Sequence, residues 1–500
     1  MQIKTIYQEL YYRGHSDVRR VEMPRHILGD ILENILLELD GIEDIARDSP
    51  PLFDYPSFIR EISIYYMCCG IRSYILDAQS ASNEAKSKRG PYTDVEWTSF
   101  TRQTQQFVRE LFKLFLRRST SIRSLNLAMQ ERDFCLRENP SKYLALDHYT
   151  DGRVALSKMR QFSSGGEGKQ FCDILSKFCH NLESFRIVYN SGGEFDNLIK
   201  AQRHLRNLQV LHVDLTEDTV KAISTQGASL RSIELWGCLF KGVTLRALSS
   251  CRHLERIIFH DCGNMTKAVL APLATASFPR LSTVYFKFRG QLESKDLPIH
   301  ELAHLVANTR STLTQLCIEG LGYPCPEIFE SLVNSQQLRK ISMQIQTLDE
   351  LPLVLGILKT CKNLRSVSIA ENQKFFAESF GLTMELVSQY LDANEFLPRV
   401  AQILSEQVQH LVLNIPNCWV TPGTLREFFK DCKANLEYLR WQSYEDSRFF
   451  VDVIDEYGRK MQRDVKYGNW KWEQASGQFG PVTLDVEFRK KNASYFRYVC

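Results

Sequence analysis

The sequence of 500 residues predicts an α/β solenoid, in which short parallel strands line a concave inner face and helices cover the outside. Three observations favour this class. A hexapeptide with apolar residues at its first, fourth and sixth positions recurs along the chain. Its copies follow one another at nearly constant spacing, and characteristic residues stand before and after several copies. We therefore expect one long body curved like a right-handed horseshoe.

The hexapeptides are the predicted strands. Their apolar triplets are Leu182/Phe185/Ile187, Leu208/Leu211/Val213, Leu230/Ile233/Leu235, Leu254/Ile257/Phe259, Leu281/Val284/Phe286, Leu313/Leu316/Ile318, Leu338/Ile341/Met343, Leu364/Val367/Ile369, Val408/Leu411/Leu413 and Leu436/Leu439/Trp441, with a less regular earlier copy at Ile122/Leu125/Leu127. Residues two apart on a strand share one face. The fourth and sixth positions are therefore expected in the core, and the residues beside them on the concave face.

The spacing of the hexapeptides carries more weight than the pattern itself, of which roughly 20 copies would arise by chance in a chain of this length. From Leu182 onward, successive copies start 22 to 32 residues apart, except for one step of 44 residues. Most steps lie in or near the range of leucine-rich repeats, about 20–29 residues. The longest step indicates an insertion or an unmatched repeat.

Between the predicted strands, segments such as 243–248 and 268–273 carry apolar residues three to four apart, as expected of outer helices. Cys238 and Cys262 each stand three residues after the last apolar position, where a side chain can bond the backbone as it leaves the strand. With the phrase Cys-x-Asn-Leu at Cys179 and Cys361, the pattern resembles the cysteine-containing leucine-rich repeat that often follows an F-box. This resemblance covers about residues 180–445.

Four regions follow from this organisation. We expect a helical N-terminal segment over residues 1–45, a helical connector over 46–120 with an exposed loop at 78–94, the repeats over 121–445, and a C-terminal cap over 446–500. The cap is rich in aromatic residues, which can cover the apolar edge of the last repeat.

The N-terminal segment contains an amphipathic helix with proline in its first turn. It resembles the opening helix of an F-box, and the resemblance implies contact with a Skp-type adaptor of a cullin-RING ubiquitin ligase. The residues that would make this contact are Met23, Pro24, Ile27, Leu28, Ile31 and Leu32. The downstream part of an F-box is missing, because Asp48-Ser49-Pro50-Pro51 interrupts the pattern. The F-box is therefore truncated or degenerate.

A second resemblance follows it. Residues 51–64 are similar to the connector between F-box and repeats in expanded fungal F-box/leucine-rich-repeat families. Residues 27–50 could then equally be the helix that follows an F-box. The alternative without any adaptor is a helical cap over the first repeat.

Composition narrows the function classes. The chain is 44% hydrophobic and 24% charged, which predicts a folded protein with a large core. A net charge of +3 lacks the basic excess of a nucleic-acid binder, and no apolar stretch is long enough to span a bilayer. The 14 cysteines include no Cys-x-x-Cys pair, so we expect reduced thiols in a protein of the cytoplasm or nucleus, and no cofactor.

The concave face of the middle repeats is the predicted binding surface, because parallel strands stack their outward residues into columns about 4.8 Å apart. Aromatic and arginine residues among polar ones are the usual composition of a protein interface. The candidates for binding a protein substrate are His212, Asp214, Glu234, Trp236, Arg256, His260, Tyr285 and Lys287. The alternative is that Trp236 folds back over its own solenoid and that Tyr285 is an ordinary solvated residue.

One catalytic pattern occurs. His300, Glu301 and His304 match H-E-x-x-H, which places two zinc-binding imidazoles one helical turn apart beside a glutamate base. The segment lies where the repeats require an outer helix, and no matching third ligand follows it. Glu319 could in principle be a third ligand, but it is predicted on the concave side of a strand. We therefore expect a solvated helix face and no metal site.

The sequence thus favours a non-catalytic protein-recognition module, which by resemblance selects substrates for an SCF-type ubiquitin ligase. A stand-alone repeat scaffold without ligase contact is the alternative. A zinc peptidase that uses His300, Glu301 and His304 is a remote one.

Overall fold

The computed structural model describes residues 59–65, 67–68, 71, 94–128, 144, 150–165, 169–188, 195–288, 296–345, 350–371, 393–414, 420–443, 448–467, 471–472 and 482–490. The N-terminal segment 1–45, with all six adaptor-binding candidates, lies outside these residues. The expected loop at 78–94 also lies outside them, except for Asp94.

The fold is a mixed α/β arrangement built on one large, mainly parallel sheet. Its 16 described strands are β1 (Glu61–Ser63), β2 (Ser124–Asn126), β3 (Gln161–Gly165), β4 (Ser184–Val188), β5 (Asn207–Leu211), β7 (Ser232–Trp236), β9 (Arg256–Cys262), β10 (Thr283–Phe288), β11 (Gln315–Glu319), β12 (Lys340–Ile345), β13 (Ser366–Glu371), β14 (His410–Asn414), β15 (Tyr438–Ser443), β16 (Arg463–Tyr467), β17 (Lys471–Trp472) and β18 (Val482–Lys490). A second, two-stranded sheet pairs β6 (Asp214–Leu215) with β8 (Leu239–Phe240).

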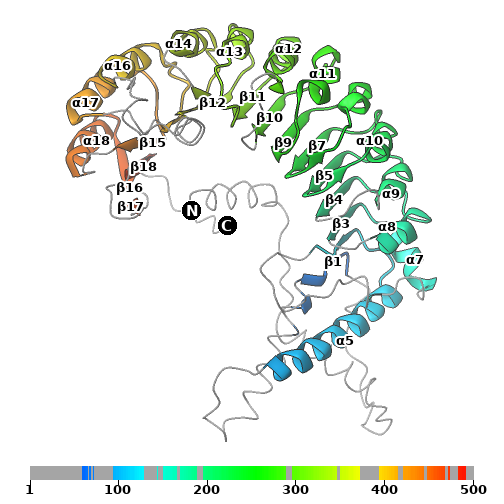
Figure 1. The fold of residues 1–500 in the computed structure, drawn as a ribbon. Coiled ribbons are helices and arrows are strands. Elements are labelled where there is room, and N and C mark those ends of the chain that lie inside the picture. Colours follow the sequence, from blue (N-terminus) through cyan, green and yellow to red (C-terminus); the bar gives the residue numbers. More distant parts are fainter. Residues whose placement is uncertain are drawn as a thin grey trace, which may run out of the picture.

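Helices connect successive strands and lie on the outer side of a curved arc, while the strands lie on its inner side (Figure 1). The described helices are α5 (Asp94–Arg118), α7 (Thr150–Ser157), α8 (Lys169–Ser176), α9 (Asp196–Lys200), α10 (Glu217–Ser224), the 3-10 helix η3 (Leu245–Ser250), α11 (Lys267–Thr275), α12 (Ile299–Thr309), α13 (Pro326–Leu332), α14 (Leu351–Thr360), α16 (Ala393–Ile403), α17 (Pro422–Asp431) and α18 (Arg448–Lys460). The α/β class and the alternation of parallel strands with helices are therefore confirmed.

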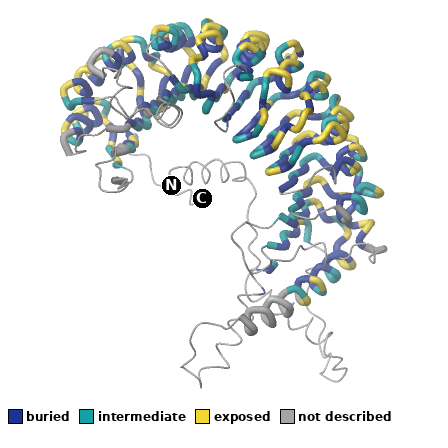
Figure 2. Tube along the Cα trace, in the orientation of Figure 1, coloured by how far each residue is buried: buried dark blue, intermediate teal, exposed yellow. Residues whose placement is uncertain are grey.

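The core lies between the strands and the outer helices, and exposed residues gather mainly on the outer side (Figure 2). In β7, Ile233 and Leu235 are fully buried, while their neighbours Glu234 and Trp236 are only partly buried. Burial of one such aliphatic side chain stabilises the fold by roughly 1.5–3 kcal/mol. Each repeat therefore gains its stability from contact with the helices and strands of its neighbours.

The register of β5 differs from the sequence prediction by three residues. Leu208 pairs with Ile233 and Val210 with Leu235, so the inward residues of β5 are Leu208 and Val210. The prediction placed Leu211 and Val213 there. The segment satisfies the apolar pattern in both frames, and only the frame that begins at Leu205 aligns with the next strand.

The parallel sheet begins earlier than residue 121. Strand β1 pairs with β2 through Ile62 and Leu125, and β3 follows through Phe162. At the other end, β18 runs antiparallel to β15, and β16 pairs with its far side. Antiparallel strands and α18 therefore cover the last parallel strand. The edge of β15 is therefore paired, and β16 is the last strand of the sheet at this end.

The 44-residue step contains an insertion and no additional strand in the described sheet. Strand β13 pairs directly with β14, through Ser366 and His410. The extra residues, 372–392, lie outside the described part of the chain. The sheet therefore passes this point without a break.

Two buried glutamines tie neighbouring repeats together. The Gln202 amide donates to the carbonyl oxygens of Cys179 and Leu198, both at 2.8 Å, and its oxygen accepts from the N–H of Leu182 at 2.9 Å. Gln226, one repeat later, donates to the carbonyl oxygens of Ile199 and Gln202 at 2.9 and 3.0 Å. These side chains satisfy backbone groups that would otherwise be buried without partners.

Substitution Gln202→Leu should destabilise the protein markedly. It removes three buried hydrogen bonds and leaves backbone groups unsatisfied, each at a cost of about 1–3 kcal/mol. We expect the free energy of unfolding to fall by at least about 3 kcal/mol, measured by urea denaturation followed by circular dichroism. Gln315→Leu on the concave face is the control, since Gln315 is exposed. Equal stability of the two variants would contradict the role of Gln202.

Candidate functional site

The concave face of β5, β7, β9 and β10 presents three columns of side chains. The strand register defines them as Asn207, Ser232, Arg256 and Thr283; Gln209, Glu234, Ile258 and Tyr285; and Leu211, Trp236, His260 and Lys287. Six of the eight predicted binding residues stand in these columns. The other two, His212 and Asp214, do not.

Three aromatic rings form a stack across neighbouring strands. The rings of Trp236 and His260 are parallel to within 18°, with centroids 4.4 Å apart. The rings of His260 and Tyr285 are parallel to within 13°, with centroids 5.7 Å apart. His260 lies between the other two rings and is only 3% exposed. Trp236 and Tyr285 stay partly exposed. We call Trp236, His260 and Tyr285 the aromatic stack.

The stack fixes the positions of the outer rings. Trp236 packs against the next strand's ring, and stacked aromatic pairs contribute about 0.5–1.5 kcal/mol beyond the area that they bury. The Nδ1 atom of His260 lies 3.2 Å from an Asp261 carboxylate oxygen. His260 thus positions Trp236 and Tyr285 and has little surface of its own to offer a ligand.

A polar group lies beside the stack. The Glu234 carboxylate accepts a hydrogen bond from Gln209 at 3.0 Å and lies 3.8 Å from the Arg256 guanidinium. The Glu234 side chain is 15% exposed, whereas that of Arg256 is 52% exposed. Glu234 is therefore held within the surface, and Arg256 extends from it with donor groups free for an incoming acceptor.

The next two strands, β11 and β12, continue the surface with partly buried polar groups. The Glu319 carboxylate accepts from the hydroxyl of Ser342 at 2.9 Å and from the thiol of Cys317 at 3.4 Å. Burial, together with the nearby Cys317 and Glu319, raises the pKa of the Tyr285 phenol. Tyr285 therefore remains neutral at physiological pH and can donate a hydrogen bond.

The assignment of His212 and Asp214 to the concave columns was wrong, because the frame of β5 is shifted. His212 follows the strand with φ of 55°, and a Cβ at Gly237 would lie 2.4 Å from its Nδ1 atom, so its ring packs against that glycine. Asp214 belongs to β6 and forms an ion pair with Lys241 at 2.6 Å. Gln209 and Leu211 occupy the expected places. The alternative hexapeptide Leu205/Leu208/Val210 could have identified them.

The two cysteines after the strands bond the backbone as expected. The Cys238 thiol donates to the Val210 carbonyl oxygen and the Cys262 thiol to the Leu235 carbonyl oxygen, both at 3.3 Å. Both cysteines are buried and free. Each thiol therefore ties the end of its strand to the preceding strand of the sheet.

The H-E-x-x-H residues lie on the outer helix α12, on the opposite side of the sheet from the aromatic stack. The Nε2 atoms of His300 and His304 are 3.0 Å apart, and His300 Nδ1 lies 3.5 Å from a Glu327 oxygen. Glu319 lies on the concave side and cannot join them. Within the described ranges, no three His, Cys, Asp or Glu side chains are grouped to hold a metal ion.

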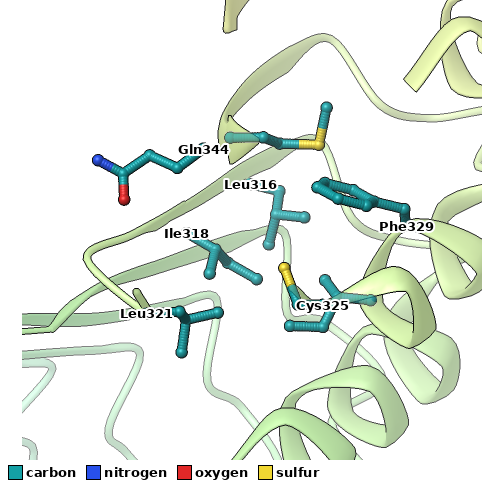
Figure 3. Close-up of a pocket in the computed structure, with 8 residues that line it drawn as sticks. Leu316, Ile318, Leu321, Cys325, Phe329 and Gln344 are labelled. Carbon is teal, nitrogen blue, oxygen red and sulfur yellow. The ribbon is translucent and has the colours of Figure 1, made fainter. Parts of the chain in front are cut away.

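A small apolar cavity lies between β11, β12 and α13 (Figure 3). Its lining residues are Leu316, Ile318, Leu321, Cys325, Ile328, Phe329, Met343 and Gln344. Its volume of about 10 Å³ is at the lower limit of what one water molecule needs. The cavity is therefore a packing gap in the core and not a ligand site.

No protein-family model matches the chain, and no curated protein sequence matches it at a significant level. Among the helices that the structure describes, none is long and apolar enough to cross a membrane.

The arrangement on α12 predicts that the protein does not hold zinc there. After purification in metal-free buffer, we expect far less than one zinc ion per chain by mass spectrometry of the metal content. His300→Ala should leave that content unchanged, because a stable zinc site needs three or more protein ligands. Stoichiometric zinc that is lost in the His300→Ala variant would overturn the interpretation.

Proposed function

We propose that this chain is a leucine-rich-repeat solenoid, a right-handed horseshoe whose concave face binds a protein. The observation that carries the proposal is the aromatic stack, a rigid pair of partly exposed rings beside an exposed arginine. Tryptophan, tyrosine and arginine are the residues that most often dominate binding energy at protein interfaces. Rings already fixed by stacking lose little conformational entropy when a ligand binds.

The polar group next to the stack supports a proteinaceous ligand. Arg256 offers guanidinium donors, and Tyr285 offers a neutral hydroxyl donor, so both suit carbonyl or carboxylate groups of a peptide chain. Lys287 continues the third column beside His260. A ligand that covers both rings and Arg256 would cross three strands.

For the cellular role, we propose substrate recognition for a cullin-RING ubiquitin ligase, in the cytoplasm or the nucleus. This part rests on the F-box-like residues 23–32 and on the cysteine-containing repeat. The chain itself would be non-catalytic. The second candidate is a stand-alone scaffold, because the concave surface could bind a protein equally well without a ligase. Only the N-terminal segment distinguishes a ligase subunit from a scaffold. A zinc peptidase is disfavoured by the position of His300 and His304 on an outer helix.

The double variant Trp236→Ala/Tyr285→Ala should lose its protein partners. Loss of two central aromatic anchors should reduce the amount of captured partner at least tenfold. Pull-down from cells of the source organism, read by quantitative mass spectrometry, measures this. The control is Glu217→Ala/Lys221→Ala on the exposed face of α10. An unchanged partner list with a stably folded double variant would refute the concave site.

The ligase role predicts co-purification with a Skp-type adaptor. Full-length protein should form a stoichiometric complex with the adaptor in size-exclusion chromatography, and removal of residues 1–45 should abolish it. The substitution Leu28→Asp should do the same with the chain otherwise complete, because an apolar contact would then have to bury a charge. If the full-length chain shows no adaptor complex, the protein is a scaffold.

A further inference from the structure

The residue immediately before each parallel strand forms a separate row along one rim of the sheet. In this row, the N–H groups of Arg160 and Gln161 both donate to the carbonyl oxygen of Arg123, at 2.8 and 2.9 Å. The same pair of hydrogen bonds joins the N–H groups of Arg123 and Ser124 to the carbonyl oxygen of Arg60, and it recurs in the later repeats. The rim residues are therefore spaced like the strands, about 4.8 Å apart.

Arginine dominates this row. Its arginines are Arg60, Arg123, Arg160, Arg206, Arg231, Arg339 and Arg365, and its carboxylates are Glu183, Glu255 and Glu437. Two carboxylates neutralise neighbours: Glu183 lies 2.5 Å from Arg160, and Glu255 lies 3.5 Å from Arg231. The acidic residues therefore interrupt the row and divide its positive charge into local groups.

One of these groups surrounds a hollow of about 280 Å³ between the starts of β2, β3 and β4. Its lining residues are Ser121, Arg123, Lys158, Arg160 and Asn181. The hollow is far larger than the cavity of about 10 Å³ in the core. All five side chains are polar, and none is acidic.

The cations around the hollow are incompletely neutralised. Arg160 is paired with Glu183, and Lys158 donates to the carbonyl oxygen of Thr120 at 3.1 Å. Neither Arg123 nor Lys158 has a carboxylate within ion-pair distance among the described residues. Three cations with one adjacent carboxylate leave two positive charges on a concave, polar surface. Such a surface concentrates small anions.

We propose that this hollow binds a phosphoryl group on a phosphorylated segment of a protein. Arginine presents a planar fork that matches phosphate oxygens, and lysine adds a point charge. Ser121 and Asn181 can donate further hydrogen bonds. A phosphoserine carries about two negative charges at neutral pH, which balances the two that the site leaves open. The site is independent of the aromatic stack and needs no ligand there.

The observations favour a compact phosphoryl group over a nucleic acid. A nucleic-acid strand needs a continuous row of cations along its backbone. The carboxylates of Glu183 and Glu255 break the rim row on one side of the hollow. The net charge of +3 provides no wider basic field. A single anion in the hollow lies near only one of these carboxylates, that of Glu183, which is already paired with Arg160.

The experiment uses the full-length chain and fluorescent peptides of randomised sequence around one fixed phosphoserine. Fluorescence anisotropy gives the dissociation constant. Two further ligands are measured in parallel: the same peptide mixture with unmodified serine, and a single-stranded oligonucleotide. The test variants are Arg123→Gln and Lys158→Gln, both of exposed residues, so that neither should unfold the chain. The matched control is Arg339→Gln, which removes an exposed arginine from the same rim position in β12's repeat.

We expect the phosphoserine peptides to bind at least tenfold more tightly than the serine peptides, with inorganic phosphate as a competitor. Each test variant should weaken binding about tenfold, the effect of losing one charged hydrogen bond, and Arg339→Gln should not. Equal binding by the test variants and the wild type would overturn the proposal. So would an equal loss in Arg339→Gln, or tighter binding of the oligonucleotide, since both indicate unspecific attraction of anions.

Discussion

The fixed register of the parallel backbone ladder determines where every described side chain of the sheet lies. From β1 to β15, each strand bonds the next in the same frame, apart from a shift after Lys287 at the end of the β9–β10 pair, so a residue type at one strand position is repeated in space as a column. The helices can cover only one face of this sheet. In most strands, apolar residues at two positions bury that face, and the residues between them are left to the concave side.

Several strands of the ladder end in a similar way. The residue after the strand takes a left-handed backbone conformation at His212, Gly237 and Gly320, with φ between 55° and 78°, and Asp261, the next-to-last residue of β9, takes it with φ of 53°. Gly237 combines this backbone conformation with close contact to the His212 ring. Any other residue there would have to push the His212 ring aside. The buried thiols of Cys238 and Cys262 follow immediately and bond the preceding repeat. Strand length, and with it the width of the concave face, is therefore set by these turns.

Periodicity predicted most of this fold, and its failures have physical causes. The frames of β7, β9 and β10 follow directly from their triplets, because only one frame is apolar there. In β5, the segment 205–213 contains two overlapping triplets, and pairing with β7 selects between them. Strand β1 carries the triplet Ile59/Ile62/Ile64 and was missed, although the pattern is present. Strand β3 could not be found in this way, since Ser164 fills an inward position.

In the candidate sites too, some features follow from the sequence of one strand, whereas others depend on the strands that lie next to it. Trp236, Arg256 and Tyr285 could be predicted as concave residues from their strand positions alone. That His260 would be buried between two rings depends on three strands at once. The net charge of +3 gives no sign of the local excess of positive charge beside Arg123, because charges elsewhere in the chain cancel it. A near-neutral chain can therefore carry a strong local site for an anion, provided that its register places the cations on adjacent strands.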